Sequence, residues 1–237
     1  MKNLLFGYIM LTLFLASCAP QTPTEPPSII IEQPGNGEPS SGETLSPVEY
    51  AVVEQLSENL GLSINDITVR ESKSTEFSDA CLGVVMQDVL CAQVITPGYI
   101  ILLEAGDIQY EYHTSEDGSR IQPATLALTW SRDGGIAGFC DRLTVFLSGE
   151  VYGNQCNMQD GRMETFASLL SGSERSQFDM WMKQYGQMTL DASDPKGVAD
   201  GMSLILVFIG MGESMPGKTV EQEMLSWAQD LFQRLYE

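Results

Sequence analysis

The sequence predicts an α+β protein with two small domains, each an antiparallel sheet packed with one or two helices, after a signal peptide and a disordered linker. Three observations support this: a short apolar run that ends at a cysteine, a proline-rich segment after it, and mixed helix and hairpin signals throughout the rest. We place the signal peptide at 1–17, the lipidated cysteine and linker at 18–45, the first domain at 46–122 and the second at 123–237.

The chain begins with the pattern of an exported protein. Lys2 precedes an apolar run that ends at Leu15 and is about a dozen residues long, shorter than the roughly 20 that span a membrane. The run leads into Leu15-Ala16-Ser17-Cys18, which resembles the bacterial lipobox. This resemblance implies lipid on Cys18, which would anchor the exported protein to the cell membrane or outer membrane, facing outside the cytoplasm. An ordinary signal peptide with a chance cysteine, or an uncleaved anchor, is the alternative.

The segment after Cys18 is predicted to be a flexible tether. Seven of the eleven prolines lie between Pro20 and Pro47, among Thr, Ser, Gly and Glu, and such a composition cannot bury a core. The short apolar stretch Ser28–Ile31 is either an exposed spot in this linker or a docked strand.

The strongly acidic charge excludes nucleic acid as a partner. Removal of residues 1–17 leaves 11 basic and 32 acidic side chains, a formal charge near −21, which repels phosphate backbones and anionic head groups. Solubility is sufficient to explain this charge. The acids are scattered, and they form no calcium loop with regularly spaced ligands.

Four cysteines besides Cys18 indicate two disulfides in an exported chain. Of the three connectivities, Cys81–Cys91 with Cys140–Cys156 fits the strand pattern best, because a hairpin loop at 147–149 would place the second pair on opposite strands. The chain has a single histidine, His113, and no paired C-x-x-C, so neither a metal site nor a cofactor is predicted.

The first domain is predicted to open with a helix. Ser46-Pro47-Val48-Glu49 forms a capping box, and Gly61 supplies the stop. Val48, Val52, Leu56 and Leu60 recur on one face.

A small antiparallel sheet follows this helix. We expect a strand from Ile67, then the cysteine loop, then a hairpin of Tyr99–Leu103 and Ile108–Tyr112. We expect His113 at the surface, at the end of a strand. Residues 48–122 resemble an uncharacterised module of exported bacterial proteins, and the resemblance implies no activity. It rests on Asp79–Gly83, Cys91, Pro97–Tyr99 and Tyr110–His113.

The second domain is predicted to combine hairpins with two helices. Its strands are expected at Ala124–Trp130, Phe139–Leu147, Glu150–Cys156, Phe166–Leu170 and Met202–Ile209, with a loop at Asp191–Asp200. Ser171 and Glu174 form a capping box for a helix whose apolar stripe is Phe178, Trp181, Met182 and Tyr185. Thr219–Gln222 is expected to cap the last helix, with Met224, Leu225, Ala228, Leu231, Phe232 and Leu235 facing inward.

A glycine turn joins the first two of these strands. It consists of Arg132, Asp133, Gly134, Gly135, Ile136, Ala137, Gly138 and Phe139. The turn lacks the G-x-G-x-x-G spacing and leads into a strand, so nucleotide binding is rejected.

Over residues 125–236 the turn and the order of elements resemble emfourin-type inhibitors of thermolysin-like metalloproteases. The resemblance implies that the turn enters a protease cleft. This sequence differs in placing the turn after a whole domain and in adding a cysteine hairpin. The alternative is that the glycines only permit a tight turn.

No nucleophile and base can be identified, so an enzyme is not predicted. Gly212–Pro216 lacks the final glycine of a nucleophile elbow. We therefore expect a membrane-tethered protein with a non-enzymatic binding role, in particular inhibition of a secreted or envelope protease through the glycine turn. The alternatives are a structural envelope lipoprotein without a soluble ligand and a hydrolase that uses paired carboxylates.

Overall fold

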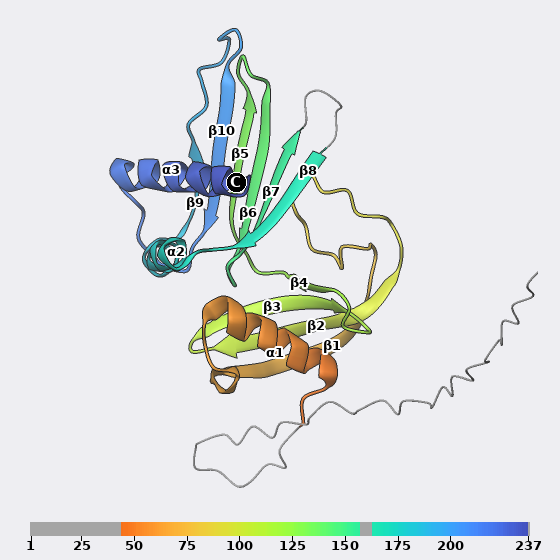
Figure 1. Cartoon of the computed structure of the whole chain (residues 1–237). Helices are drawn as coiled ribbons and strands as arrows, with labels where there is room; N and C mark the ends of the chain where they lie inside the picture. Colours follow the sequence, from red (N-terminus) through yellow and green to blue (C-terminus); the bar gives the residue numbers. More distant parts are fainter. Residues whose placement is uncertain (1–43, 157–162, 237) are drawn as a thin grey trace, which may run out of the picture.

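The computed structural model describes residues 44–156 and 163–236, which form two antiparallel sheets and three helices (Figure 1). The predicted α+β class is confirmed. The four-stranded sheet has the order β1-β2-β3-β4, and the six-stranded sheet has the order β8-β7-β6-β5-β10-β9. The signal peptide, Cys18 and the linker with Ser28–Ile31 lie outside the described residues.

The first half consists of one helix and the four-stranded sheet. Helix α1 (Pro47–Leu60) starts at the predicted capping box, where the Glu49 N–H donates to Ser46 Oγ at 3.2 Å and the Ser46 N–H donates to Glu49 Oε2 at 2.8 Å. It ends at Gly61 in the left-handed region, with φ 64°. The remaining elements are η1 (Ile64–Asp66), β1 (Ile67–Phe77), β2 (Thr96–Ala105), β3 (Ile108–Ser115) and β4 (Ile121–Pro123).

The second half consists of the six-stranded sheet and two helices. Its elements are β5 (Leu126–Gly134), β6 (Phe139–Phe146), β7 (Glu150–Cys156), β8 (Met163–Leu169), α2 (Gly172–Gln184), β9 (Gln187–Asp191), β10 (Met202–Ile209) and α3 (Lys218–Arg234). The capping box at Ser171 and Glu174 is confirmed.

The structure differs from the sequence predictions at two places in this half. Helix α3 begins one residue before Thr219, and its N-cap is Gly217, which makes no side-chain hydrogen bond, so Thr219 lies inside the first turn. Strand β9 was not predicted, because it is a five-residue edge strand whose pairing depends entirely on β10.

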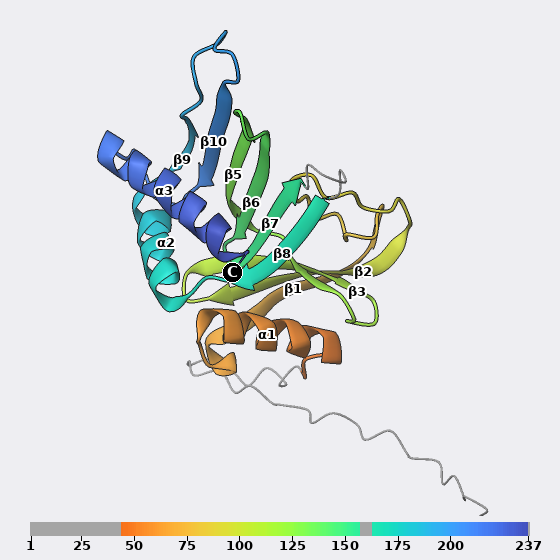
Figure 2. The ribbon, with the colours of Figure 1, turned by 45° about the horizontal axis from the view of Figure 1, so that its top comes forward.

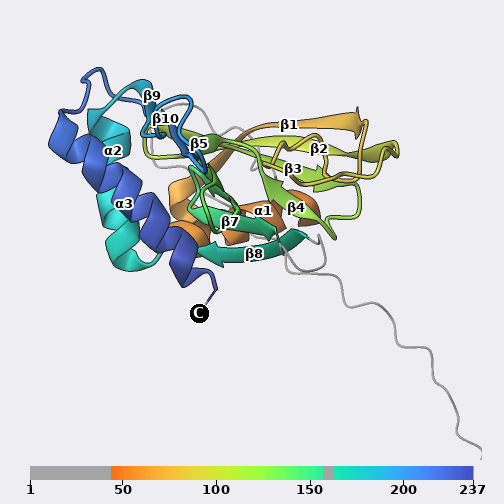
Figure 3. The same cartoon turned by 90° about the horizontal axis from the view of Figure 1, so that it is seen from above.

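Helices α2 and α3 lie together against the six-stranded sheet, as Figure 3 shows from above. The ring of Trp227 in α3 contacts those of Phe178 and Trp181 in α2, at centroid distances of 6.1 and 5.6 Å. Phe232 of α3 meets the buried Trp130 of β5 at 5.4 Å. No helix within the described ranges is both long and apolar enough to cross a membrane.

The two halves share their core. Two separate domains would each have a core of its own, but most of the buried apolar side chains form one continuous cluster from Val52 and Leu56 of α1 to Phe232 of α3. Figure 2 shows α1 on the four-stranded sheet, next to the six-stranded sheet. The domain boundary at 122–123 stays a prediction.

A buried carboxylate joins the halves. The Oε1 atom of Glu150 accepts hydrogen bonds from Gln55 Nε2 at 3.0 Å, Asn59 Nδ2 at 2.6 Å and the Tyr112 hydroxyl at 2.9 Å. The Ser148 hydroxyl donates to Oε2. Glu150 is only 6% exposed. Burial, followed by the neighbouring charge of Glu150, raises the pKa of Tyr112 well above its ordinary value.

Candidate functional site

The glycine turn closes the β5–β6 hairpin at one end of the six-stranded sheet. Gly134 pairs with Phe139, and the Gly138 N–H donates to the Gly135 carbonyl at 3.0 Å. Gly134, Gly135 and Gly138 have φ of 80°, 68° and 63°, a region that other residues rarely adopt. The glycines therefore allow residues 135–138 to form this tight turn.

The loop between β9 and β10 lies beside this turn (Figure 1). Gly134 pairs with Met202, and the Gly135 N–H donates to the Gly201 carbonyl at 3.3 Å. A Cβ on Gly134 would lie 2.7 Å from that carbonyl oxygen, so only glycine fits there. We call residues 135–138 together with loop 192–201 the tip.

The tip exposes aliphatic side chains. Ile136 is 92% exposed and Val198 is 52% exposed. Ala137 is also exposed. Of the eight residues predicted to form the binding turn, Ile136 and Ala137 are therefore the side chains that a partner can reach most easily.

Arg132 and Phe139 support the hairpin from within. The Arg132 Nε and Nη2 atoms donate to Asp141 Oδ2 at 2.8 and 2.5 Å, and the guanidinium lies 3.7 Å from the Phe139 ring centroid. Asp141 is 1% exposed, and burial raises its pKa although Arg132 lowers it. The sequence placed Arg132 in the binding turn, but in the structure its guanidinium forms an ion pair with Asp141.

Arg142 links Asp133 of the turn to the first half of the chain. Arg142 Nη2 lies 2.8 Å from Asp133 Oδ1, and Arg142 Nε lies 2.6 Å from Asp88 Oδ2. In the same region, Asn154 Nδ2 donates to the Gln87 carbonyl at 2.6 Å. Gln87 and Asp88 belong to the cysteine loop, so this loop packs on the six-stranded sheet.

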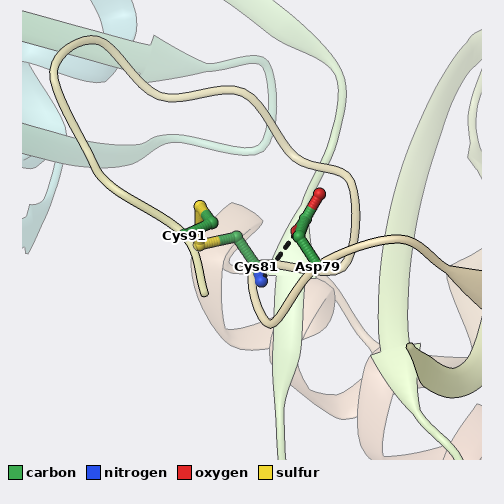
Figure 4. Close-up of side chains that lie close together, drawn as sticks. All are labelled: Asp79, Cys81 and Cys91. Atoms are coloured by element: carbon green, nitrogen blue, oxygen red, sulfur yellow. Dashed lines mark hydrogen bonds between the residues drawn. A yellow bond between two sulfur atoms is a disulfide. The ribbon is translucent and has the colours of Figure 1, made fainter. Parts of the chain in front are cut away.

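The cysteine loop is closed by the predicted Cys81–Cys91 disulfide. Asp79 Oδ1 accepts from the N–H groups of Cys81 at 2.9 Å and Gly83 at 3.1 Å, as Figure 4 shows for Cys81. Cys140 is disulfide-bonded as well. The side chain of Cys156 lies outside the described part of the structure, so the pairing Cys140–Cys156 stays a prediction.

His113 fixes the loop from below. Its Nδ1 atom lies 2.6 Å from the carbonyl oxygen of the fully buried Leu82, and its ring stacks on Phe77 at 5.0 Å. His113 is 9% exposed. Its expected surface position is therefore wrong, because the loop folds back over the end of β3.

The segment between β1 and β2 exposes further apolar side chains, which the sequence did not predict. Val85 is 84% exposed and Leu90 is 99% exposed, and Val94 and Ile95 are exposed as well. The available signal was a set of apolar residues without helix or strand periodicity, between the two cysteines and shortly after Cys91. A core position could not be distinguished from a surface position without the fold.

The described residues contain one compact group of three metal-ligating side chains, Asp79, Cys81 and Cys91. Both sulfur atoms belong to the disulfide, whereas metal ions bind the free thiolate. The group therefore acts here as a structural clamp.

Comparison with known proteins finds a family match for one segment of the chain. Residues 49–123 match a family described as a domain of unknown function (DUF8738). The matched segment contains most of α1, the cysteine loop and the whole four-stranded sheet. Neither the curated proteins nor the solved structures include a match to this chain.

Proposed function

We propose that this chain is an extracytoplasmic binding protein without catalytic activity, which holds a partner protein at its tip. The observation that carries the proposal is the exposure of Ile136, 92% of whose surface faces solvent on a tight turn with three glycines at positive φ. Burial of such a side chain by a partner is favourable by roughly 1.5–3 kcal/mol.

The partner class that fits best is a secreted protease of the thermolysin-like group. The tip projects from one end of the six-stranded sheet, a shape that can enter a cleft, and Ile136 would be buried there. The resemblance of residues 125–236 to emfourin-type inhibitors supports the same class. Behind the turn, Asp141 and Arg132 neutralise each other. The apolar side chains of the turn would therefore make the contact with the protease.

We expect inhibition of at least one thermolysin-like protease at micromolar protein, and a loss of about tenfold or more in Ile136→Asp, because a carboxylate cannot enter an apolar pocket without a large desolvation cost. Inhibition constants across a panel of secreted proteases measure this effect. Leu90→Asp is the matched control, since Leu90 is equally apolar and 99% exposed, but on the cysteine loop. No inhibition by the unmodified chain contradicts the inhibitor hypothesis, and a loss confined to Leu90→Asp moves the contact to that loop.

The proposal includes a lipid tether at Cys18. One acyl chain binds a membrane only marginally, whereas the two or three chains of a lipoprotein hold it firmly. Cys18→Ala is expected to abolish lipid incorporation and release the protein from the membrane fraction, measured by labelling with a fatty acid and by fractionation. Retention of a cleaved, unlipidated chain at the membrane contradicts the tether.

A further inference from the structure

Strand β8 forms one edge of the six-stranded sheet. It pairs with β7 alone among the described strands, and Figure 3 shows it at the outer margin of the sheet. The Leu170 N–H donates to the Gly149 carbonyl at 3.0 Å, and backbone groups alternate in direction along an antiparallel strand. By this alternation, the N–H and C=O groups of Thr165 and Ala167 point away from β7, where a further strand can pair with them.

The other edge strands have features that oppose pairing with a further strand. Strand β1 carries Arg70 and Lys73 and has an irregular register with β2. Strand β4 has three residues and ends at Pro123, and β9 has five residues. Charges, proline, irregular register and short length all protect sheet edges. Strand β8 pairs regularly with β7 over seven residues, and its only charged residue is Glu164, so it is the edge best suited to receive another strand.

Both faces of β8 present apolar side chains at this edge. On one face, the ring of Phe166 lies 4.5 Å from that of Tyr236, which follows α3. Side chains alternate between the faces of a strand, so Met163 and Leu169 lie on the opposite face. They are 39% and 44% exposed. A strand paired with β8 would therefore cover apolar surface on both faces.

We propose that β8 binds β8 of a second copy of this chain, in antiparallel register centred on Phe166. This register places Thr165 opposite Ala167 of the second copy, so their outward N–H and C=O groups form hydrogen bonds. It also places the two Phe166 side chains opposite each other, and Met163 opposite Leu169 of the second copy. Because the two strands are identical, a two-fold axis repeats every one of these contacts.

The charges at this edge fit the same register. Glu164 comes opposite Ser168 of the second copy, and the Ser168 hydroxyl accepts a hydrogen bond from Arg234 Nη1 at 3.2 Å. The Arg234 side chain is 35% exposed although it also pairs with Glu174. Glu164 of one copy therefore approaches Arg234 of the other. The formal charge of −20 on each chain opposes association at long range, so added salt should strengthen the dimer by screening this repulsion.

Sedimentation of the purified chain across the micromolar concentration range tests this proposal. A reversible equilibrium between monomer and dimer is expected, and added sodium chloride should shift it toward the dimer. Ala167→Pro removes an outward N–H but no hydrogen bond to β7, and it should weaken dimerisation by about tenfold or more. Leu169→Lys places a charge at the same edge and should act in the same direction. Leu62→Lys is the matched control, because Leu62 is 41% exposed but lies after α1, and it should dimerise normally.

Cross-linking tests the register itself. Opposed residues of a hydrogen-bonded antiparallel pair have Cα atoms roughly 5.5 Å apart, which suits a disulfide. An oxidised mixture of Thr165→Cys and Ala167→Cys chains should therefore give a covalent dimer that contains one chain of each kind. The same mixture made with Leu62→Cys in place of Ala167→Cys should not.

Three results overturn the proposal. The first is a chain that stays monomeric at all concentrations, and the second is a dimer that Ala167→Pro and Leu169→Lys leave intact. The third is dimerisation only after Ile30→Asp, which would identify the chain's own Ser28–Ile31 as the strand on β8. Ile136→Asp should dimerise normally, so the dimer and the inhibition by the tip succeed or fail separately.

Discussion

Glu150→Ala is expected to lower the free energy of unfolding by about 3–5 kcal/mol, because it leaves several buried donors without an acceptor. These donors come from α1, β3 and the β6–β7 turn, so the substitution removes one of the polar contacts between the halves. Urea unfolding followed by far-ultraviolet circular dichroism measures the loss, and tryptophan fluorescence follows the second half, where all three tryptophans lie.

Two further variants make this prediction specific. Glu54→Ala removes an exposed glutamate from the same helix as Gln55, and we expect a change within about 0.5 kcal/mol. Glu150→Gln keeps the shape and one acceptor oxygen but turns an amide N–H₂ toward a donor. Its loss of unfolding free energy should therefore fall between those of Glu54→Ala and Glu150→Ala. A loss in Glu150→Ala no greater than that in Glu54→Ala would show that the carboxylate does not join the halves.

Arg132→Met is expected to cost about 3–5 kcal/mol at neutral pH, because it leaves the buried Asp141 carboxylate without its cation. Methionine fills a similar volume beside Phe139, so the loss reports mainly the charge. Arg132→Met/Asp141→Leu removes both charges and should recover most of the stability. If the double variant is no more stable than Arg132→Met, packing and not the unpaired carboxylate causes the loss.

The pH dependence of this pair has a definite sign. The folded-state pKa of Asp141 is raised above its ordinary value of 3.8, so the stability that this group contributes is fully present below 3.8 and is lost as pH rises through the folded value. Without Arg132 the folded pKa rises further. The stability difference between Arg132→Met and the unmodified chain should therefore shrink as the solution is acidified, which urea unfolding at neutral and mildly acidic pH measures.

Residues close together in the chain were enough to predict most of the local structure. The capping boxes at Ser46 and Ser171, the stop at Gly61 and the bounds of β10 follow from hydrogen bonds or side-chain periodicity within a few residues. The Cys81–Cys91 disulfide was predictable for a similar reason, since the two cysteines are only ten positions apart. Strand β9 did not follow, because its partner begins beyond a long loop.

The functional surfaces depend on contacts between distant parts of the chain. Asn59 and Glu150 are 91 positions apart, and no local pattern marks Glu150 as buried. The sequence did identify the glycine turn, yet only the packed hairpin separates the exposed Ile136 from Arg132, which is held by Asp141. Local hydrogen bonds and periodicity can be recognised from residues that are neighbours in the sequence. Burial and charge pairing arise only when the two sheets pack against each other.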